Sequence, residues 1–135
     1  MSEATSRFRA VVFDLDGTLI DSYDAIHDAL GTVLRSFGQA PVSRDQVKRM
    51  VGHGLESLIE RSVGAENVEE GVELFRERYA EVGLEMTALL PGAEHVVREL
   101  AKRDVVMAVA SNKPSDFSRD LLHGLGIGAR FDEIV

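Results

Sequence analysis

Asp14 and Asp16 follow an apolar run, and their spacing indicates chemistry. They stand two residues apart after Arg9-Ala-Val-Val-Phe13, and Gly17 follows them. Alternate residues of a strand point to the same side, so both carboxylates are expected to face one way at the end of a buried strand. Neighbouring carboxylates repel unless a hard cation such as Mg²⁺ or a bound proton neutralises them. The pair therefore predicts a catalytic or metal site rather than only a turn between strand and helix.

The segments around this pair predict alternating strands and helices. Residues 8–14 are apolar without alternation, which is typical of a parallel strand covered on both faces. Residues 22–86 carry apolar side chains at helical spacing, and Pro91-Gly92 marks the end of this helical module. Residues 105–110 form a second buried apolar run, and residues 131–135 begin a third strand. The sequence thus predicts strands that flank a small set of helices.

Composition excludes several classes of function. The chain has 135 residues, a formal net charge of -8 and no cysteine. An acidic chain does not favour a nucleic acid or an anionic membrane as partner, and without cysteine there is no disulfide, thiolate nucleophile or zinc-thiolate site. The first seven residues lack the apolar core of a signal peptide, and no later run is long enough to cross a bilayer. A cytoplasmic protein with a small-molecule partner is expected.

Two motifs resemble those of the haloacid dehalogenase superfamily. The nine residues Asp14-Leu-Asp-Gly-Thr-Leu-Ile-Asp-Ser22 are similar to its first motif, and to the phosphoglycolate phosphatase and β-phosphoglucomutase branch in particular. Ser111-Asn112-Lys113-Pro114, after the second apolar run, resembles the second motif. The resemblance implies an α/β fold. Residues 1–20 and 89–135 would form an incomplete Rossmann-like core with a parallel sheet, and residues 21–88 an inserted helical cap.

The resemblance also assigns chemical roles to the two aspartates. Asp14 would attack phosphorus and form an aspartyl-phosphate. Asp16 would protonate the departing alkoxide and then activate the water that hydrolyses the intermediate. Mg²⁺ would bind the Asp14 carboxylate and the Asp16 backbone carbonyl. The implied activity is Mg²⁺-dependent hydrolysis of a small phosphorylated metabolite, a phosphate monoester similar to phosphoglycolate.

Other residues are implied in binding the phosphate or the rest of the substrate. Two segments leave alternatives open: Lys113 is a ligand or a solvated surface lysine, and the loop of residues 52–54 contacts the substrate or is a plain turn. Asp21 is interpreted as a helix cap. The implied binding residues are Leu15, Thr18, His53, Gly54, Ser111, Asn112 and Lys113.

The family pattern extends beyond the motifs found here. It adds a lysine after the third strand and acids after a fourth, and neither is present in these 135 residues. The chain as written is therefore expected to hydrolyse esters poorly. The absent strand is expected to lie between residues 10–14 and the rest of the sheet, so that residues 10–14 become an apolar edge. A phosphatase is the favoured function; an isomerase of the phosphoglucomutase type and a non-catalytic binding module are the alternatives.

Overall fold

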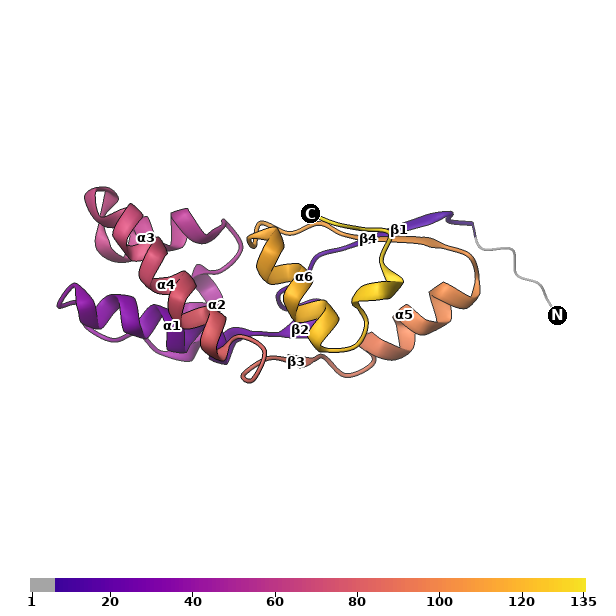
Figure 1. The fold of residues 1–135 in the computed structure, drawn as a ribbon, viewed down its shortest axis with the longest axis horizontal. Helices are drawn as coiled ribbons and strands as arrows, with labels where there is room; N and C mark the ends of the chain where they lie inside the picture. The colour runs from indigo at the N-terminus through magenta and orange to yellow at the C-terminus, as the bar shows by residue number, and fades with distance from the viewer. Residues whose placement is uncertain (1–6) are drawn as a thin grey trace.

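The computed structural model describes residues 7–135, in which a sheet part lies beside a helical part (Figure 1). Residues 1–6, which the predicted core included, lie outside this range. β1 (Ala10–Phe13), β4 (Val106–Val109) and β5 (Glu133–Ile134) form a parallel three-stranded sheet in the order β1-β4-β5. Phe13 pairs with Val109, so the residues after β1 and after β4 leave the sheet at one edge.

The helical part runs from α1 to α4. Its helices are α1 (Tyr23–Ser36), α2 (Arg44–Met50), α3 (Leu55–Val63) and α4 (Val68–Val82), with a 3₁₀ turn at Ala65–Asn67 before α4. Apolar side chains recur at helical spacing on α1 and face α4, which is its main packing partner. The apolar stripes seen in the sequence therefore form the core of this part.

Local signals explain two features of these helices. Ser43 accepts a hydrogen bond from the Gln46 amide and Gln46 returns one to Ser43, which is a complete capping box at the start of α2. In α4, Gly71 lets the helices approach closely, because a Cβ there would lie 2.5 Å from Cγ2 of Ile59. Both features fix how the helices begin and how tightly they pack.

Two very short strands join the helical part to the sheet part. β2 (Ile20–Asp21) and β3 (Ala88–Leu89) pair antiparallel, so the chain enters and leaves the helical part side by side (Figure 1). The Leu90 amide extends the pairing by donating to the Leu19 carbonyl over 2.9 Å. The sequence did not predict this pair, because two residues are too few to show a periodicity.

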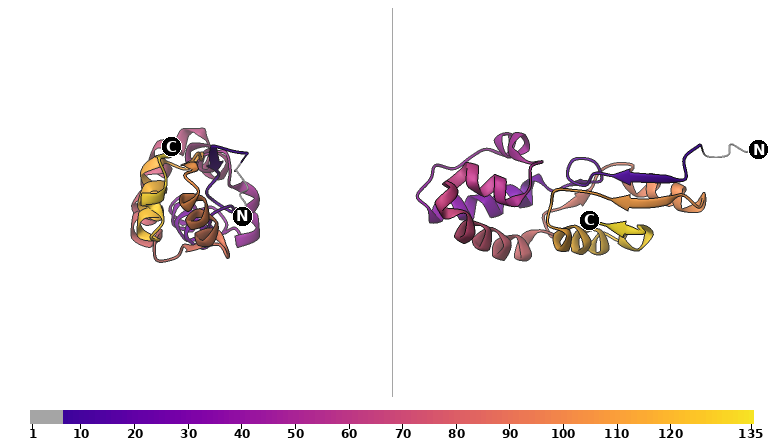
Figure 2. Two further views of the ribbon diagram at one scale, coloured as in Figure 1. Left: turned by 90° about the vertical axis from the view of Figure 1, so that its right-hand side faces the viewer. Right: turned by 90° about the horizontal axis from the view of Figure 1, so that it is seen from above.

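Two helices cover one face of the main sheet. α5 (Ala93–Lys102) and α6 (Ser115–Gly124) lie against it, with a 3₁₀ turn at Gly128–Arg130 before β5 (Figure 2). Met107 and Val109 point to this side and are 1% and 0% exposed. Val12 and Val106 point the other way and are 66% and 51% exposed. The prediction of strands covered on both faces is therefore wrong for the described residues.

The pairing of β1 also corrects one expectation. Val106 donates to the Arg9 carbonyl and Ala110 to the Phe13 carbonyl, each over 2.9 Å, so the ladder between β1 and β4 is continuous from end to end. No strand can lie between them, and the expected intervening position of a further strand is wrong. Among the described residues, β1 lies at an edge of the sheet, as expected.

Candidate active site

Asp14 and Asp16 lie on a tight turn directly after β1. Leu15 between them is fully buried, and Gly17 has a φ of 81°, which favours glycine. A Cβ on Gly17 would lie 2.5 Å from the Tyr23 hydroxyl oxygen, so the turn packs closely against the start of α1. The turn holds both aspartates at the carboxyl edge of the sheet, where open α/β sheets bind ligands.

Asp16 is held by two donors from distant parts of the chain. Lys113 Nζ donates to Asp16 Oδ1 over 3.2 Å, and the Ser22 hydroxyl donates to the same oxygen. The side chains of Lys113 and Asp16 are only 6% and 11% exposed. Lys113 is therefore not a solvated surface lysine, and Ser22, at the N-cap position of α1, uses its hydroxyl on Asp16 and does not cap the helix.

Tyr79 supports the buried lysine from the helical part. The Lys113 ammonium lies 4.6 Å from the centroid of the Tyr79 ring. Burial alone lowers the pKa of Lys113, but Asp16 and Tyr79 outweigh it, so the pKa lies above its ordinary value. Burial raises the pKa of the Tyr79 hydroxyl, and Lys113 opposes this only in part. The site thus contains a fixed positive charge beside a neutral phenol.

The segment after β4 contacts both parts of the molecule. The Ser111 hydroxyl accepts from the Lys113 amide over 3.1 Å, and the Ser111 amide donates to the Val135 carbonyl over 3.0 Å. Asn112 Nδ2 donates to the Gly52 carbonyl over 2.8 Å. This last bond ties the loop before α3 to the sheet edge.

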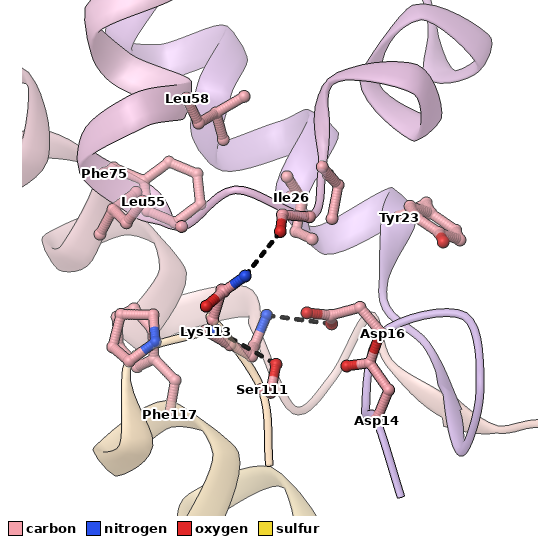
Figure 3. A pocket seen from close by; sticks show the side chains of 15 residues that line it. Asp14, Asp16, Tyr23, Ile26, Leu55, Leu58, Phe75, Ser111, Lys113 and Phe117 are labelled. Carbon is pink, nitrogen blue, oxygen red and sulfur yellow. Dashed lines mark hydrogen bonds and ion pairs between the residues drawn. The ribbon is translucent and has the colours of Figure 1, made fainter. Parts of the chain in front are cut away.

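These elements enclose a cavity of about 200 Å³ between the sheet edge and the helical part (Figure 3). Lys113 lies between the two aspartates and the apolar side chains of the helical part, and Tyr23 lies beyond the aspartates. The predicted site residues that line the cavity are Asp14, Asp16, Gly54, Ser111, Asn112 and Lys113.

Three predicted binding residues do not line the cavity. Leu15 is buried, and its amide donates to Asp14 Oδ1 over 2.7 Å. Thr18 is exposed and does not line the cavity. His53 is also exposed, because Gly52 and Gly54 on either side of it have φ values of 125° and 90° and present backbone to the cavity while the imidazole stays in solvent.

Other residues at the site had no signal in the sequence. Tyr79 is only one of the apolar positions of the helical module, and nothing in the sequence singles out Tyr23, yet Tyr23 lines the cavity and Tyr79 contacts Lys113. Asp21 lies outside the cavity, forms an ion pair of 3.0 Å with Arg44, and accepts a long hydrogen bond of 3.4 Å from the Tyr23 amide. The helix-cap interpretation of Asp21 is wrong, because Asp21 ends β2 and Ser22 occupies the N-cap position of α1.

The oxygen donors fit a hard cation that keeps most of its water. Within residues 7–135 no group of three or more His, Cys, Asp or Glu side chains is placed to hold a metal. Asp14 and Asp16 nevertheless both line the cavity, and Mg²⁺ commonly binds through one or two carboxylates together with water and substrate oxygens. The two aspartates match that smaller donor set.

A parallel α/β sheet carries a helical part over its carboxyl edge, with carboxylates and a lysine between them, and this edge is where open α/β sheets bind ligands. The profile of the haloacid dehalogenase-like hydrolases matches residues 11–135, and the chain belongs to that family. The predicted α/β fold with a Rossmann-like core and a helical cap is confirmed. Within the described residues, no helix is long and apolar enough to cross a membrane.

Individual relatives agree with the family. The chain is 34% identical to phosphoglycolate phosphatase 1 of Pseudomonas aeruginosa over 98% of its own length and 52% of the relative's. It is 36% identical to a phosphoglycolate phosphatase of Pseudomonas fluorescens, covering 94% and 50%. A haloacid dehalogenase-like hydrolase from Streptococcus pneumoniae superposes with a TM-score of 0.84 at 27% identity, covering 94% of this chain and 60% of that one. The chain spans about half the length of the curated relatives it matches.

Proposed function

We propose that this chain carries the nucleophile and the acid of a Mg²⁺-dependent phosphatase that hydrolyses small phosphate monoesters. One observation carries the proposal: Asp14, Asp16 and Lys113 come from two neighbouring parallel strands and line one small cavity. The names of the relatives, which are phosphoglycolate phosphatases, support the same class of reaction.

Asp14 acts as the nucleophile in this proposal. One of its carboxylate oxygens attacks phosphorus, and the bond from phosphorus to the ester oxygen breaks. Asp16 gives its proton to that oxygen and later takes one from the attacking water, which releases inorganic phosphate and regenerates Asp14. Ser22 and Lys113 keep the Asp16 carboxyl in position for both steps, and Asp16 has to take up a proton from solvent before the first of them.

The positive charge of Lys113 also acts on the substrate phosphate. It lies at the same cavity as Asp14, where it offsets the negative charge of the phosphate oxygens and of the two carboxylates. The Asp14 carboxylate and the Asp16 carbonyl would hold Mg²⁺, which would supply further neutralisation and alignment. We also propose that Ser111 and Asn112 bind the phosphate. A cytoplasmic location is part of the same proposal.

The proposal is tested with two isosteric substitutions in the same motif. Phosphate release from a small ester with Mg²⁺ is expected to fall by at least about 10³-fold in Asp14→Asn, because the nucleophile is lost. Asp21→Asn removes a carboxylate that lies outside the cavity, and it is expected to keep the parent rate. Equal rates in Asp14→Asn and the parent would refute the role of Asp14.

A second measurement does not depend on turnover. Beryllium fluoride forms phosphoryl-like adducts with carboxylates, and fluorine NMR detects the bound form. With Mg²⁺ present we expect bound signals for the parent and for Asp21→Asn. Their persistence in Asp14→Asn would show that the adduct forms elsewhere.

A further inference from the structure

The cavity has two chemically different ends (Figure 3). At one end lie the two aspartates. At the other end lie Leu55 and Leu58 of α3 and Phe75 of α4, with Lys113 between the two groups (Figure 3). These three apolar side chains belong to the buried core of the helical part, at 6%, 5% and 4% exposed. A phosphate placed beside Lys113 therefore directs the rest of the substrate toward an apolar wall.

The apolar end offers no counter-charge. Lys113 is the sole cationic side chain among the described residues that line the cavity, and its Nζ already contacts Asp16. Arg76 lies over the Phe117 ring, 4.5 Å from its centroid, but it is paired with Asp116 and does not line the cavity. A carboxylate on the leaving group would therefore be desolvated against hydrocarbon without a partner, which is costly.

The amino end of α3 does not supply the missing counter-charge. Gly54, its N-cap, lines the cavity, and free backbone amides at a helix start attract anions. The first turn of α3, however, already contains the carboxylate of Glu56. That carboxylate already offsets part of the helix dipole.

We propose that this site takes phosphate monoesters whose leaving group is apolar, an aryl or short alkyl alcohol, in preference to esters that carry a carboxylate. The inference rests on the proposed phosphatase function and specifies its substrate class. In the reaction the bond from phosphorus to the ester oxygen breaks, the proton of Asp16 goes to that oxygen, and a neutral alcohol leaves from the apolar end. The cavity of about 200 Å³ limits the substrates to small esters.

The test compares two ligands that cannot be hydrolysed. Benzylphosphonate carries an aromatic group on phosphorus, and phosphonoacetate carries a carboxylate in its place. Titration of the chain with Mg²⁺ present is expected to give at least about tenfold tighter binding of benzylphosphonate. In a series of alkylphosphonates each added methylene is expected to tighten binding by up to about fourfold until the wall is reached. Equal or tighter binding of phosphonoacetate would overturn the inference.

A charge placed in the wall provides a matched variant. Leu58→Arg puts a cation at the apolar end and is expected to shift the binding ratio toward phosphonoacetate by at least about tenfold. Val96→Arg places the same side chain on α5, where Val96 is 44% exposed and outside the cavity, and is expected to leave the ratio unchanged. An unchanged ratio in folded Leu58→Arg would contradict the inference. If Leu58→Arg does not fold, the ligand comparison on the parent decides alone.

Phosphate release separates this inference from the function on which it rests. Faster hydrolysis of phosphoglycolate than of benzyl phosphate, with both rates lost in Asp14→Asn, would keep the phosphatase function and refute the apolar preference. If the binding ratio is as expected but phosphate release is the same in Asp14→Asn and in the parent, the phosphatase function is refuted and the apolar preference is kept. Release that favours benzyl phosphate and depends on Asp14 would support both.

Discussion

Replacing Lys113 by Met is expected to destabilise the chain strongly. Methionine keeps most of the length and apolar volume of the lysine stem, so the change mainly removes the charge. Asp16 then keeps Ser22 as a donor but loses its buried counter-ion, and such losses cost about 3–5 kcal/mol. Since the Asp16 side chain is still 11% exposed, we take the lower end, about 3 kcal/mol. With a urea m-value of about 2 kcal/mol/M, the midpoint should fall by about 1.5 M.

The matched control is Lys102→Met. Lys102 also has a single carboxylate partner, Glu99 at 3.1 Å, but its side chain is 73% exposed. Exposed ion pairs contribute about 0–1 kcal/mol, so the same substitution should shift the midpoint by at most about 0.5 M. Urea unfolding followed by circular dichroism gives both values under one set of conditions.

A double-mutant cycle decides whether Asp16 is the cause. Asp16→Asn removes the charge that Lys113 neutralises, so Lys113→Met should cost less in that background, with a coupling of about 1–3 kcal/mol. Equal midpoints for the parent and Lys113→Met, or strict additivity in the cycle, would refute the argument that the buried pair stabilises the site.

Two further predictions concern stability. The pKa values of Lys113 and Tyr79 are raised in the folded chain, so the unfolded chain loses these two protons at lower pH. The stabilisation from both groups is therefore complete below about pH 10 and is lost as the pH rises through the folded-state pKa values. Urea midpoints that stay constant between about pH 9 and about pH 11 would contradict this. Gly71→Ala should destabilise the folded chain by about 1–3 kcal/mol, because the added methyl group overpacks against Ile59. Gly31→Ala in α1 meets only the end of the flexible Arg35 side chain and should stabilise the folded chain by up to about 1 kcal/mol. Equal melting temperatures for the two variants would contradict this.

Local signals in the sequence predicted most elements of the fold. Residues 22–86, with apolar side chains at helical spacing, contain the helices α1 to α4, and the apolar run of residues 105–110 contains β4. Hydrophobic periodicity carries this information because helices and strands bury one face locally. β2 and β3 escaped prediction, since their pairing joins residues far apart in the chain and each strand is too short to show a pattern.

The candidate site was predicted less completely. The spacing of Asp14 and Asp16 was sufficient to place both at one cavity, but the burial of Lys113 depends on an aspartate 97 positions away and on a tyrosine of α4. The direction of His53 depends on backbone angles at its flanking glycines, which residue types alone do not determine. Contacts set by tertiary packing have no signature in local sequence.

The pairing of β2 with β3 places the two ends of the helical part next to each other. Asp21 and Ala88 are direct partners across two antiparallel strands, so the intervening helices begin and end at almost the same point. Cα atoms of such partners are about 5 Å apart, a gap that a two-residue hairpin turn closes. The helical part can therefore change in length between these two strands without changing the path of the sheet, provided that Ser22 and Tyr79, which contact Asp16 and Lys113, are kept. Chain connectivity thus separates the size of the helical part from the position of the sheet edge.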